Sequence, residues 1–509
     1  MKTPVGRARF LPSLLWFGSA VASPSPTQSF NLDRALATSD RRHFLELHAT
    51  MLNSWNPDSW QSRQANQQPK YEDEVELQEV LATLRRLPPL VTSWEVDRLL
   101  SQFADVQAGA GWILQGGDCA ESFDDCQSES IASKLKVLLQ MSLVLIFGSG
   151  QRIVRIGRIA GQYAKPRSSD VETRDGNSLP SYRGDLINRS AFTPGHRRSD
   201  PLLLLRGYER SALTLNFIRA LSEGGFADLH HPENWKLSFV ADSPECKRYQ
   251  ELVKSMGDAL RFFDTISATP IAELRRVDFF TSHEALHLHY EQSLTRESVR
   301  GCGWYNLGTH FPWIGERTRS LAGAHIEYLR GVRNPLGVKV GPKANPDEIC
   351  DLARLLNPTN EPGRLTLIHR MGCTQIQGAL PSLIEQVQRS RCKVLWLCDP
   401  MHGNTVSVSS GQKTRRFEDV LSELRSAFAI HRSCGSRLNG VHLELTGENV
   451  TECIGGSSGL TEDDLHTAYN TTCDPRLNYE QAMEIAFAIA GEIESLGNND
   501  SNHSASGRG

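Results

Sequence analysis

Short apolar segments recur along the chain from residue 112 onward, and most of them end in Gly, His, Asp or Glu. Segments of this length, rich in β-branched and aromatic residues, are typical of buried strands. We expect eight strands, at Trp112–Gly117, Ile153–Arg158, Val277–His283, Trp304–His310, Gly337–Pro342, Leu365–Gly372, Lys393–Asp399 and Gly440–Gly447. Apolar residues at helical spacing lie between several of these strands, as at Asp347–Leu356 and Phe417–Ala429.

The alternation of strands and helices predicts an α/β fold, and eight strands fit a (β/α)8 TIM barrel. An open, doubly wound sheet is the structural alternative. The gap between the second and third strands exceeds 100 residues. It must therefore contain extra helices as an insertion, at about residues 169–275.

The chain before the barrel has its own pattern. Glu72–Leu87 and Ser93–Phe103 carry apolar residues at helical spacing and are separated by Pro88 and Pro89. We therefore divide the chain into four parts. Residues 1–50 form an N-terminal extension, 51–110 a helical extension, 111–494 the catalytic barrel and 495–509 a polar, disordered tail.

Residues 1–50 contain an apolar stretch, Phe10–Ala22, preceded by basic residues. This arrangement is compatible with a targeting presequence or a dispensable, disordered extension. We expect a cytoplasmic protein, and an organellar one if residues 1–50 are a presequence.

Composition narrows the function classes. The 509-residue chain has a formal net charge of −4, with 39% hydrophobic and 22% charged residues, which gives no indication of a nucleic-acid or membrane partner. No uninterrupted apolar run reaches the roughly 18 residues needed to cross a bilayer. Its 11 cysteines are scattered, without a CxxC pair, as is typical of a reducing compartment.

Four potential metal ligands lie at or after predicted strand ends. Cys119 follows the first strand, His402 follows the seventh, Glu444 lies in the eighth, and Asp474 lies in the loop beyond it. One thiolate, one imidazole and two carboxylates suit Mn²⁺, Co²⁺, Fe²⁺ or Zn²⁺. An open position on such an ion would polarise a carbonyl group. Taken singly, a barrel cysteine is more often a buried apolar residue than a ligand, and a lone His or Glu on a strand is more often a hydrogen-bonding residue.

A denser histidine group has a different interpretation. His283, His287 and His289 continue directly from the third predicted strand. Because His287 and His289 are only two residues apart, positioning or packing is favoured over metal ligation.

Cations also gather at strand ends. They are Arg158, Lys165, Arg317, Lys339 and Arg370, with Glu316 beside Arg317. Alternation in Val-Lys-Val points Lys339 into the barrel mouth, where a buried lysine needs an anionic partner. Several cations facing one cavity would favour a multiply charged ligand such as a phosphate or carboxylate. Ordinary salt bridges at strand ends are the alternative for any single residue.

A metal beside a cavity for phosphorylated anions points to aldol-type or phosphoryl chemistry, and the residues alone lead no further. A barrel phosphohydrolase that activates water and a non-enzymatic protein that binds phosphorylated metabolites remain open at this point. Release of phosphate from a single phosphorylated metabolite would distinguish the phosphohydrolase from the binding protein.

Longer motifs carry a family resemblance. They are Gly116–Glu121, Gly157–Ser168, Leu179–Asp185, Trp313–Arg319, Asn334–Pro342, Asp399–Thr405, Glu444–Cys453 and Cys473–Asn478. In this order, from about Trp55 to Glu494, the chain resembles the type II 3-deoxy-D-arabino-heptulosonate 7-phosphate (DAHP) synthases. Residues 1–50 and the polar tail lie outside the family pattern, and Gly308–His310 departs from the Ser-Ala-His expected there.

The resemblance implies a transferase that condenses phosphoenolpyruvate with erythrose 4-phosphate and releases phosphate, as the first step of the shikimate pathway. It implies that a divalent metal, Mn²⁺ first, with Co²⁺, Fe²⁺ or Zn²⁺ as alternatives, is held by Cys119, His402, Glu444 and Asp474. By the same resemblance, phosphoenolpyruvate is bound by Arg158, Lys165, Arg317, Lys339 and Arg370, with Glu316 contributing. Arg167 and Ser168 take the phosphate of erythrose 4-phosphate, and Lys339, Cys119 and His402 form the catalytic set.

Relatives of this kind are often feedback-inhibited by aromatic amino acids, through N-terminal helices and extra helices on the barrel. Residues 71–105 and the long insertion are expected to serve here, in a homo-oligomer without nucleic-acid or membrane partners. Cys473, adjacent to the ligand Asp474, is a candidate to pair with Cys119 on oxidation and expel the metal.

Overall fold

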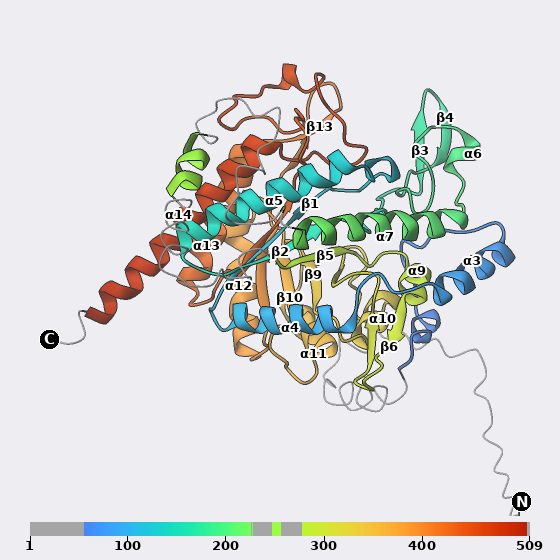
Figure 1. Ribbon diagram of the computed structural model, residues 1–509, viewed down its shortest axis with the longest axis horizontal. Helices are drawn as coiled ribbons and strands as arrows, with labels where there is room; N and C mark the ends of the chain where they lie inside the picture. The colour runs from blue at the N-terminus through green and yellow to red at the C-terminus, as the bar shows by residue number, and fades with distance from the viewer. Residues whose placement is uncertain (1–54, 225, 227–246, 256–276, 506–509) are drawn as a thin grey trace, which may run out of the picture. The chain divides into compact units, whose positions relative to one another are not determined.

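Eight parallel strands form a closed barrel in the computed structural model, which describes residues 55–224, 226, 247–255 and 277–505 (Figure 1). The strands, in their order around the barrel, are β1 Trp112–Gly117, β14 Gly440–Glu444, β11 Leu395–Cys398, β10 Leu365–His369, β9 Leu336–Val340, β8 Phe311–Ile314, β5 Phe279–Glu284 and β2 Ile153–Arg158. Strand β2 pairs with β1 and closes the ring. The predicted TIM barrel is therefore confirmed. The predicted extension 1–50 lies outside the described residues.

The fourth barrel strand differs from the prediction of Trp304–His310. Trp304–Asn306 is a strand, β7, but it pairs antiparallel with β6, Thr295–Glu297, outside the barrel. The barrel strand is the following segment, Phe311–Ile314, which pairs with β5 and β9. Both segments are apolar and short, so periodicity cannot say which of them joins the barrel. Pro312 further disguises β8, because proline is rare in central strands.

Helices follow most of the barrel strands. They are α5 Ser128–Ser149, α9 Leu288–Ser293, α10 Ala324–Arg330, α11 Pro346–Leu356, α12 Ile376–Arg389, α13 Phe417–Ser433 and α14 Tyr479–Ala505. Helix α11 shows why the start of a helix can be predicted from the sequence. The Asn345 side chain accepts a hydrogen bond from the Asp347 amide, and Pro346 occupies the first turn. Helix α14 continues past residue 495, where the tail was predicted to begin.

Helix α5 is long and strongly apolar. Among the described helices, it alone is long and apolar enough to cross a membrane. This differs from the expectation that no apolar run in the sequence is long enough to do so. However, 67% of its most apolar window is buried inside the protein, where it packs on α14 and β2. These contacts are those of a core helix.

Helix α4, Ser93–Gln107, covers the amino-terminal end of the barrel. A capping box between Thr92 and Glu95 starts the helix. Its Leu99, Phe103 and Val106 belong to one buried cluster with inward-facing side chains of the barrel strands. The end opposite to the site is therefore closed by the segment that precedes the barrel.

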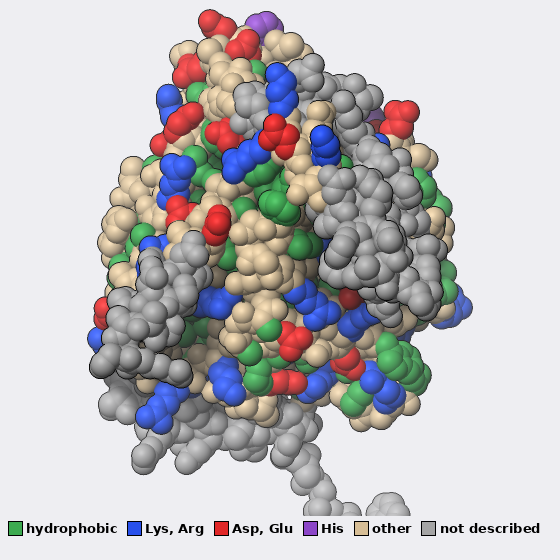
Figure 2. Space-filling view, turned by 60° about the vertical axis from the view of Figure 1, so that its left-hand side comes forward, with side chains coloured by type: hydrophobic (Ala, Val, Ile, Leu, Met, Phe, Trp, Pro, Cys, Tyr) green, Lys and Arg blue, Asp and Glu red, His purple; other side chains and the backbone are tan. Residues whose placement is uncertain are grey.

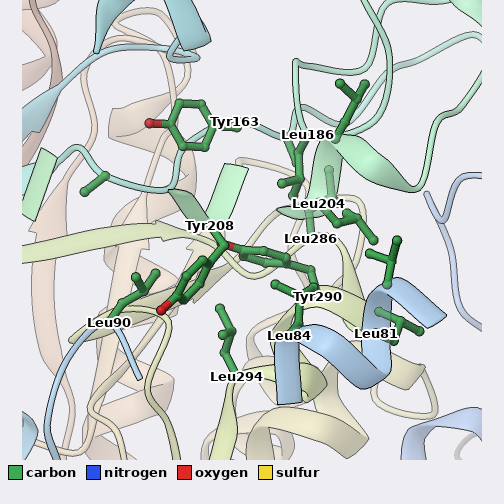
Figure 3. Packing of buried hydrophobic residues seen from close by; sticks show 14 of the residues in the cluster. Leu81, Leu84, Leu90, Tyr163, Leu186, Leu204, Tyr208, Leu286, Tyr290 and Leu294 are labelled. Carbon is green, nitrogen blue, oxygen red and sulfur yellow. The ribbon is translucent and has the colours of Figure 1, made fainter. Parts of the chain in front are cut away.

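A second hydrophobic core lies beside the barrel. It joins α3, Glu74–Arg86, to α7, Leu202–Glu223, and to the segment around α9. Figure 3 shows Leu84 of α3 near Tyr290 and Leu294, with Tyr208 and Leu204 of α7 close by. The chain before the barrel and the chain between β2 and β5 thus share one core.

The remaining elements lie in loops. They are the hairpin β3 Val171–Arg174 with β4 Asn177–Pro180, the hairpin β12 Thr405–Ser407 with β13 Lys413–Arg415, helix α6 Pro194–Arg197, and the short 3-10 turns Ser59–Ser62, Phe123–Asp125 and Glu462–Asp464. On the face seen in Figure 2, basic and acidic side chains are interspersed, in keeping with the small net charge.

Candidate active site

A polar cavity of about 820 Å³, including space open to solvent, lies at the carboxyl ends of the barrel strands. Active sites of TIM barrels form at this end. The predicted residues that line it are Arg158, Lys165, Arg167, Ser168, Glu316, Arg317, Lys339, Arg370, His402 and Asp474. The two remaining predicted residues, Cys119 and Glu444, are fully buried and contact this lining. The structure therefore brings all the predicted site residues together.

The four predicted metal ligands converge at one edge of the cavity. Ligand atoms of Cys119, Glu444 and Asp474 lie within 4.8 Å of one another. His402 Nε2 lies 3.0 Å from Glu444 Oε1. One sulfur, one nitrogen and two carboxylates grouped in this way fit a divalent ion of the Mn²⁺ to Zn²⁺ series.

Local backbone geometry places Cys119 under the cavity. Gly117 ends β1 with a φ of 145°, and a Cβ atom there would lie 2.6 Å from the Arg158 carbonyl oxygen. Only glycine tolerates this turn at such a close approach. The Cys119 sulfur then accepts a hydrogen bond from the Asp474 amide at 3.3 Å.

The loop that carries Asp474 is tied to the loop after β1 by Arg476. Its guanidinium donates to Asp118 Oδ1 at 2.7 Å and to Glu452 Oε1 at 2.7 Å. All three side chains are buried. Buried charge-assisted hydrogen bonds of this kind fix the position of Asp474 relative to Cys119.

His402 is oriented by a buried carboxylate. Its Nδ1 donates to Asp399 Oδ2 at 2.7 Å, which leaves Nε2 free to face Glu444. The same Asp399 oxygen accepts a hydrogen bond from the Lys339 ammonium. The anionic partner expected for a buried Lys339 is therefore Asp399, and it also sets the tautomer of a candidate metal ligand.

Arg158 connects the ligand cluster to the floor of the barrel. Its guanidinium donates to Glu444 Oε1 at 2.9 Å and to His442 Nε2 at 2.7 Å. His442 Nδ1 in turn donates to Gln115 Oε1 at 2.8 Å, so its tautomer is fixed as well. The Arg158 group also lies 5.4 Å from the ring centre of Trp313, within range of a cation–π contact.

Cations dominate the electrostatics around Glu444. Burial raises the pKa of this carboxyl group, but His402, Lys165 and Arg415 together bring it well below its ordinary value. Asp474 is affected in the same direction, by Lys165 and Arg415. Both groups are therefore carboxylates at neutral pH, the form that binds a metal. In contrast, burial raises the pKa of the Cys119 thiol, and Cys473 and Glu444 raise it further.

Arg370, Arg317 and Glu316 are three further predicted residues that line the cavity. Arg370 donates to the His402 carbonyl oxygen at 2.8 Å, so it lies beside the ligand cluster. Arg317 is exposed at the rim. Glu316 is already engaged, because it accepts hydrogen bonds from Arg319 at 3.0 Å and from the Gly341 amide at 2.7 Å.

Several functional residues had not been singled out from the sequence. Asp399 lies in the motif Asp399–Thr405 directly after β11, and His442 lies within β14, inside the predicted strand Gly440–Gly447. Their places in or just after a barrel strand were the available indication. Lys413 and Arg415 carried no such indication, since they lie on β13 of an outer hairpin. Arg415 nevertheless donates to Glu444 Oε2 at 2.7 Å and is fully buried.

The histidine group after β5 does not join the ligands. His283 Nε2 lies 2.9 Å from Glu291 Oε1, and His287 Nε2 lies 2.7 Å from the Tyr71 hydroxyl. These contacts hold the β5 end and α9 in place, in agreement with the positioning role expected from the sequence.

Comparison with known proteins decides the family. A model of the Class-II DAHP synthetase family matches residues 55–490, which is most of the chain. This chain belongs to that family. The assignment confirms the predicted type II DAHP synthase resemblance, and with it a transferase that forms a carbon–carbon bond.

Curated relatives agree with the family match. A phospho-2-dehydro-3-deoxyheptonate aldolase of Neurospora crassa is 49% identical over 452 residues, covering 86% of this chain and 94% of the relative. Proteins of the same name from Streptomyces coelicolor and Mycolicibacterium smegmatis are 48% and 42% identical, each over 85% of this chain and over 96% and 93% of their own lengths. A solved DAHP synthase of Thermotoga maritima aligns over 76% of this chain and 70% of its own, at 13% identity and a TM-score of 0.32, too low to add to the barrel topology seen directly.

Proposed function

We propose that this chain condenses phosphoenolpyruvate with D-erythrose 4-phosphate and water to give DAHP and phosphate, the first step of the shikimate pathway. The observation that carries the proposal is the ligand quartet of Cys119, His402, Glu444 and Asp474 beside a cation-lined cavity, in a chain of the Class-II DAHP synthetase family. A cavity with several cations suits two phosphates and one carboxylate better than a single neutral substrate.

The quartet is proposed to hold Mn²⁺, with Co²⁺, Fe²⁺ and Zn²⁺ as alternatives. When bound, such an ion polarises a carbonyl oxygen as a Lewis acid, here the aldehyde of erythrose 4-phosphate. His402 would bind through Nε2, because its Nδ1 is held by Asp399. Arg158 and Arg415 flank Glu444 from two sides and keep its carboxylate in place.

The cations of the cavity are proposed to bind phosphoenolpyruvate. Arg158, Lys165 and Lys339 are buried at its floor, whereas Arg370 and Arg317 approach from the wall and rim. C3 of phosphoenolpyruvate attacks the aldehyde carbon, water adds at C2, and the resulting tetrahedral carbon expels phosphate. Preorganised cations stabilise the charge that develops on the departing phosphate, which is commonly the largest contribution to catalysis.

The phosphate of erythrose 4-phosphate is assigned to Arg167 and Ser168. Both line the cavity and lie nearer to solvent than the buried cations. Glu316 is proposed as a supporting residue, because its carboxylate is occupied by Arg319 and Gly341. It would shape the wall beside Arg317 while Arg317 contacts the substrate.

Phosphate release with each substrate alone and with both together tests the proposal. A synthase needs both substrates and a divalent metal. A phosphohydrolase would release phosphate from phosphoenolpyruvate alone, and a binding protein would release none. Either of the last two results would contradict the proposal.

Feedback inhibition by aromatic amino acids is a finer proposal. A second cavity lies between α4, α7 and β5 and is lined by Glu95, Arg98, Arg219 and Asp278, among others. Charges of both signs beside apolar groups would suit a zwitterionic amino acid. Because α4 closes the barrel core, removing residues before 111 would expose that core. A sharper test is therefore Arg98→Ala, with inhibition measured against each aromatic amino acid and Arg85→Ala on α3 as control.

A homo-oligomer and a cytoplasmic location are proposed with the enzyme, with an organellar location if residues 1–50 are a presequence. Light scattering of the purified chain would determine its mass in solution. The N-terminal residue of the mature protein, identified by mass spectrometry, would reveal removal of a presequence.

A further inference from the structure

A group of buried side chains with metal-binding chemistry lies on the outer side of the barrel wall. His369 ends β10 and Cys398 ends β11, and the two residues are paired neighbours in the sheet register. Glu423 lies on α13, whose His431 ring lies beside His369 of β10 and Trp396 of β11. One ligand atom from each of the three lies within 4.8 Å of the others, and all three side chains are fully buried. None of them lines the active-site cavity.

Imidazole nitrogens in and beside this group lack partners in the described part of the chain. Neither ring nitrogen of His369 has a hydrogen-bond partner there, and the same holds for Nε2 of His431. The two rings are neighbours, with centroids 5.6 Å apart. A buried polar atom without a partner is rare in native proteins and usually indicates an ion or an ordered water molecule.

We propose that His369, Cys398 and Glu423 bind a second divalent metal ion of the Zn²⁺ class, separate from the ion of the active site. One imidazole nitrogen, one sulfur and one carboxylate oxygen are donors that such ions take in tetrahedral sites. A thiolate and a carboxylate would balance the two positive charges, so the loaded site would be neutral and suited to burial.

A neighbouring imidazole and several hydrogen bonds surround the three proposed ligands. Nδ1 of His431 lies 3.0 Å from the Ser436 hydroxyl, and its Nε2 has no partner among the described residues. Glu423 accepts hydrogen bonds from the Met371 amide at 2.8 Å and from Asn404 Nδ2 at 2.7 Å. Such outer contacts orient ligands in established metal sites. Burial keeps His369 neutral by lowering its pKa to about 3, and a neutral ring is the form that donates to a metal.

The ion would have a structural role. Met371 follows Arg370, and Asn404 lies two residues after His402. Glu423 therefore already connects α13 to the two loops that carry these active-site residues. An ion bound by residues of β10, β11 and α13 would hold these three elements together, and with them the two loops that follow the strands.

Cobalt spectroscopy can test for this site without using enzyme activity. The background is the full chain with Cys119→Ser and Cys473→Ser, so that no thiolate remains at the active-site cluster. The protein is produced in cobalt-supplemented medium, because a fully buried site fills most readily during folding. We expect a thiolate-to-cobalt charge-transfer band whose intensity corresponds to about one cobalt ion per chain. The natural chain should retain two ions per chain.

Matched variants assign the band. Adding Cys398→Ser should abolish it, and adding Cys350→Ser, which removes another buried thiol on α11, should leave it unchanged. Circular dichroism establishes that each variant is folded. The proposal is overturned if the background chain shows no band, or if the band survives Cys398→Ser. Retention of a single ion by the natural chain would also overturn it, even if Cys398→Ser failed to fold.

Discussion

The Asp399 carboxylate accepts a hydrogen bond from Nδ1 of His402 at 2.7 Å. This contact fixes the imidazole tautomer, so that Nε2 points at the Glu444 carboxylate 3.0 Å away. Asp399 also accepts from Lys339, a cation of the proposed phosphoenolpyruvate site. One buried carboxylate therefore positions a proposed metal ligand and a proposed substrate-binding group.

Asp399→Asn should weaken metal binding. The amide cannot hold the imidazole as firmly as the carboxylate does, and loss of an outer-shell partner typically costs roughly 10–100-fold in metal affinity or activity. Calorimetric titration of the metal-free protein with Mn²⁺ would measure the change. Asp463→Asn, at an exposed turn, is the matched control. Unchanged Mn²⁺ affinity in Asp399→Asn would contradict the role given to this contact.

Removal of a single cationic side chain or metal ligand from the site should lower catalytic activity severely. Arg370→Ala and His402→Ala are each expected to lower kcat/KM by roughly a hundredfold or more, as for loss of one preorganised donor. Steady-state kinetics with both substrates would measure this. Arg389→Ala serves as control, because that side chain is exposed on α12 and pairs only with Glu385 among the described contacts. Near-natural turnover in either site variant would refute the site assignment.

Phosphoenolpyruvate binding should weaken in mildly alkaline solution. Burial lowers the pKa of Lys339 to about 8, although Asp399 opposes the shift. The ammonium form is present below this pH and is lost as the pH rises through it. The KM for phosphoenolpyruvate should then rise by up to roughly tenfold per pH unit above 8.

Lys339→Arg provides the comparison for this pH effect, because a guanidinium remains charged throughout the range. Its KM profile between pH 7 and 9.5 should be flatter than that of the natural chain. A flat profile in the natural chain would show that Lys339 does not titrate there or does not bind the substrate.

Oxidation should inactivate the enzyme through two neighbouring thiols. Cys119 and Cys473 lie within hydrogen-bonding reach of each other. Peroxide would take two electrons, and each thiol would lose a proton as the disulfide forms. Because Cys119 would then no longer ligate the metal, activity should fall by roughly tenfold or more and return with a reductant.

Mass spectrometry under non-reducing conditions would detect the Cys119–Cys473 crosslink. Cys473→Ser should resist this form of inactivation, whereas Cys434→Ser, which changes a half-buried thiol at the end of α13, should not. Unchanged activity after oxidation, without a crosslink, would argue against the switch.

Local pattern was sufficient for most of the barrel. Strands β1 and β2 occur at the predicted residues, because each is a compact apolar segment with a clear break after it. Strand β8 was missed because the choice between Trp304–Asn306 and Phe311–Ile314 depends on which partners each segment finds. The partners of a strand are set by tertiary structure, and the spacing of apolar residues does not reveal them.

The residues of the site were likewise predicted only in part from the sequence. Alternation in β9 correctly pointed Lys339 into the cavity and required an anionic partner, but it could not name Asp399. Arg415 was beyond prediction, because an outer hairpin inserted between β11 and α13 delivers it to Glu444. The structure was therefore needed to name the partner of Lys339 and to find Arg415, which no family motif or strand end had indicated.

Identification of the product tests the proposed condensation most directly. The chain, freed of metal by chelation, is incubated with phosphoenolpyruvate and erythrose 4-phosphate, and the products are analysed by mass spectrometry before and after addition of Mn²⁺. A metal-dependent condensation should give a seven-carbon sugar acid phosphate and one equivalent of phosphate only after the metal is restored. Phosphate without that product, or the product in full yield from the metal-free chain, would contradict it.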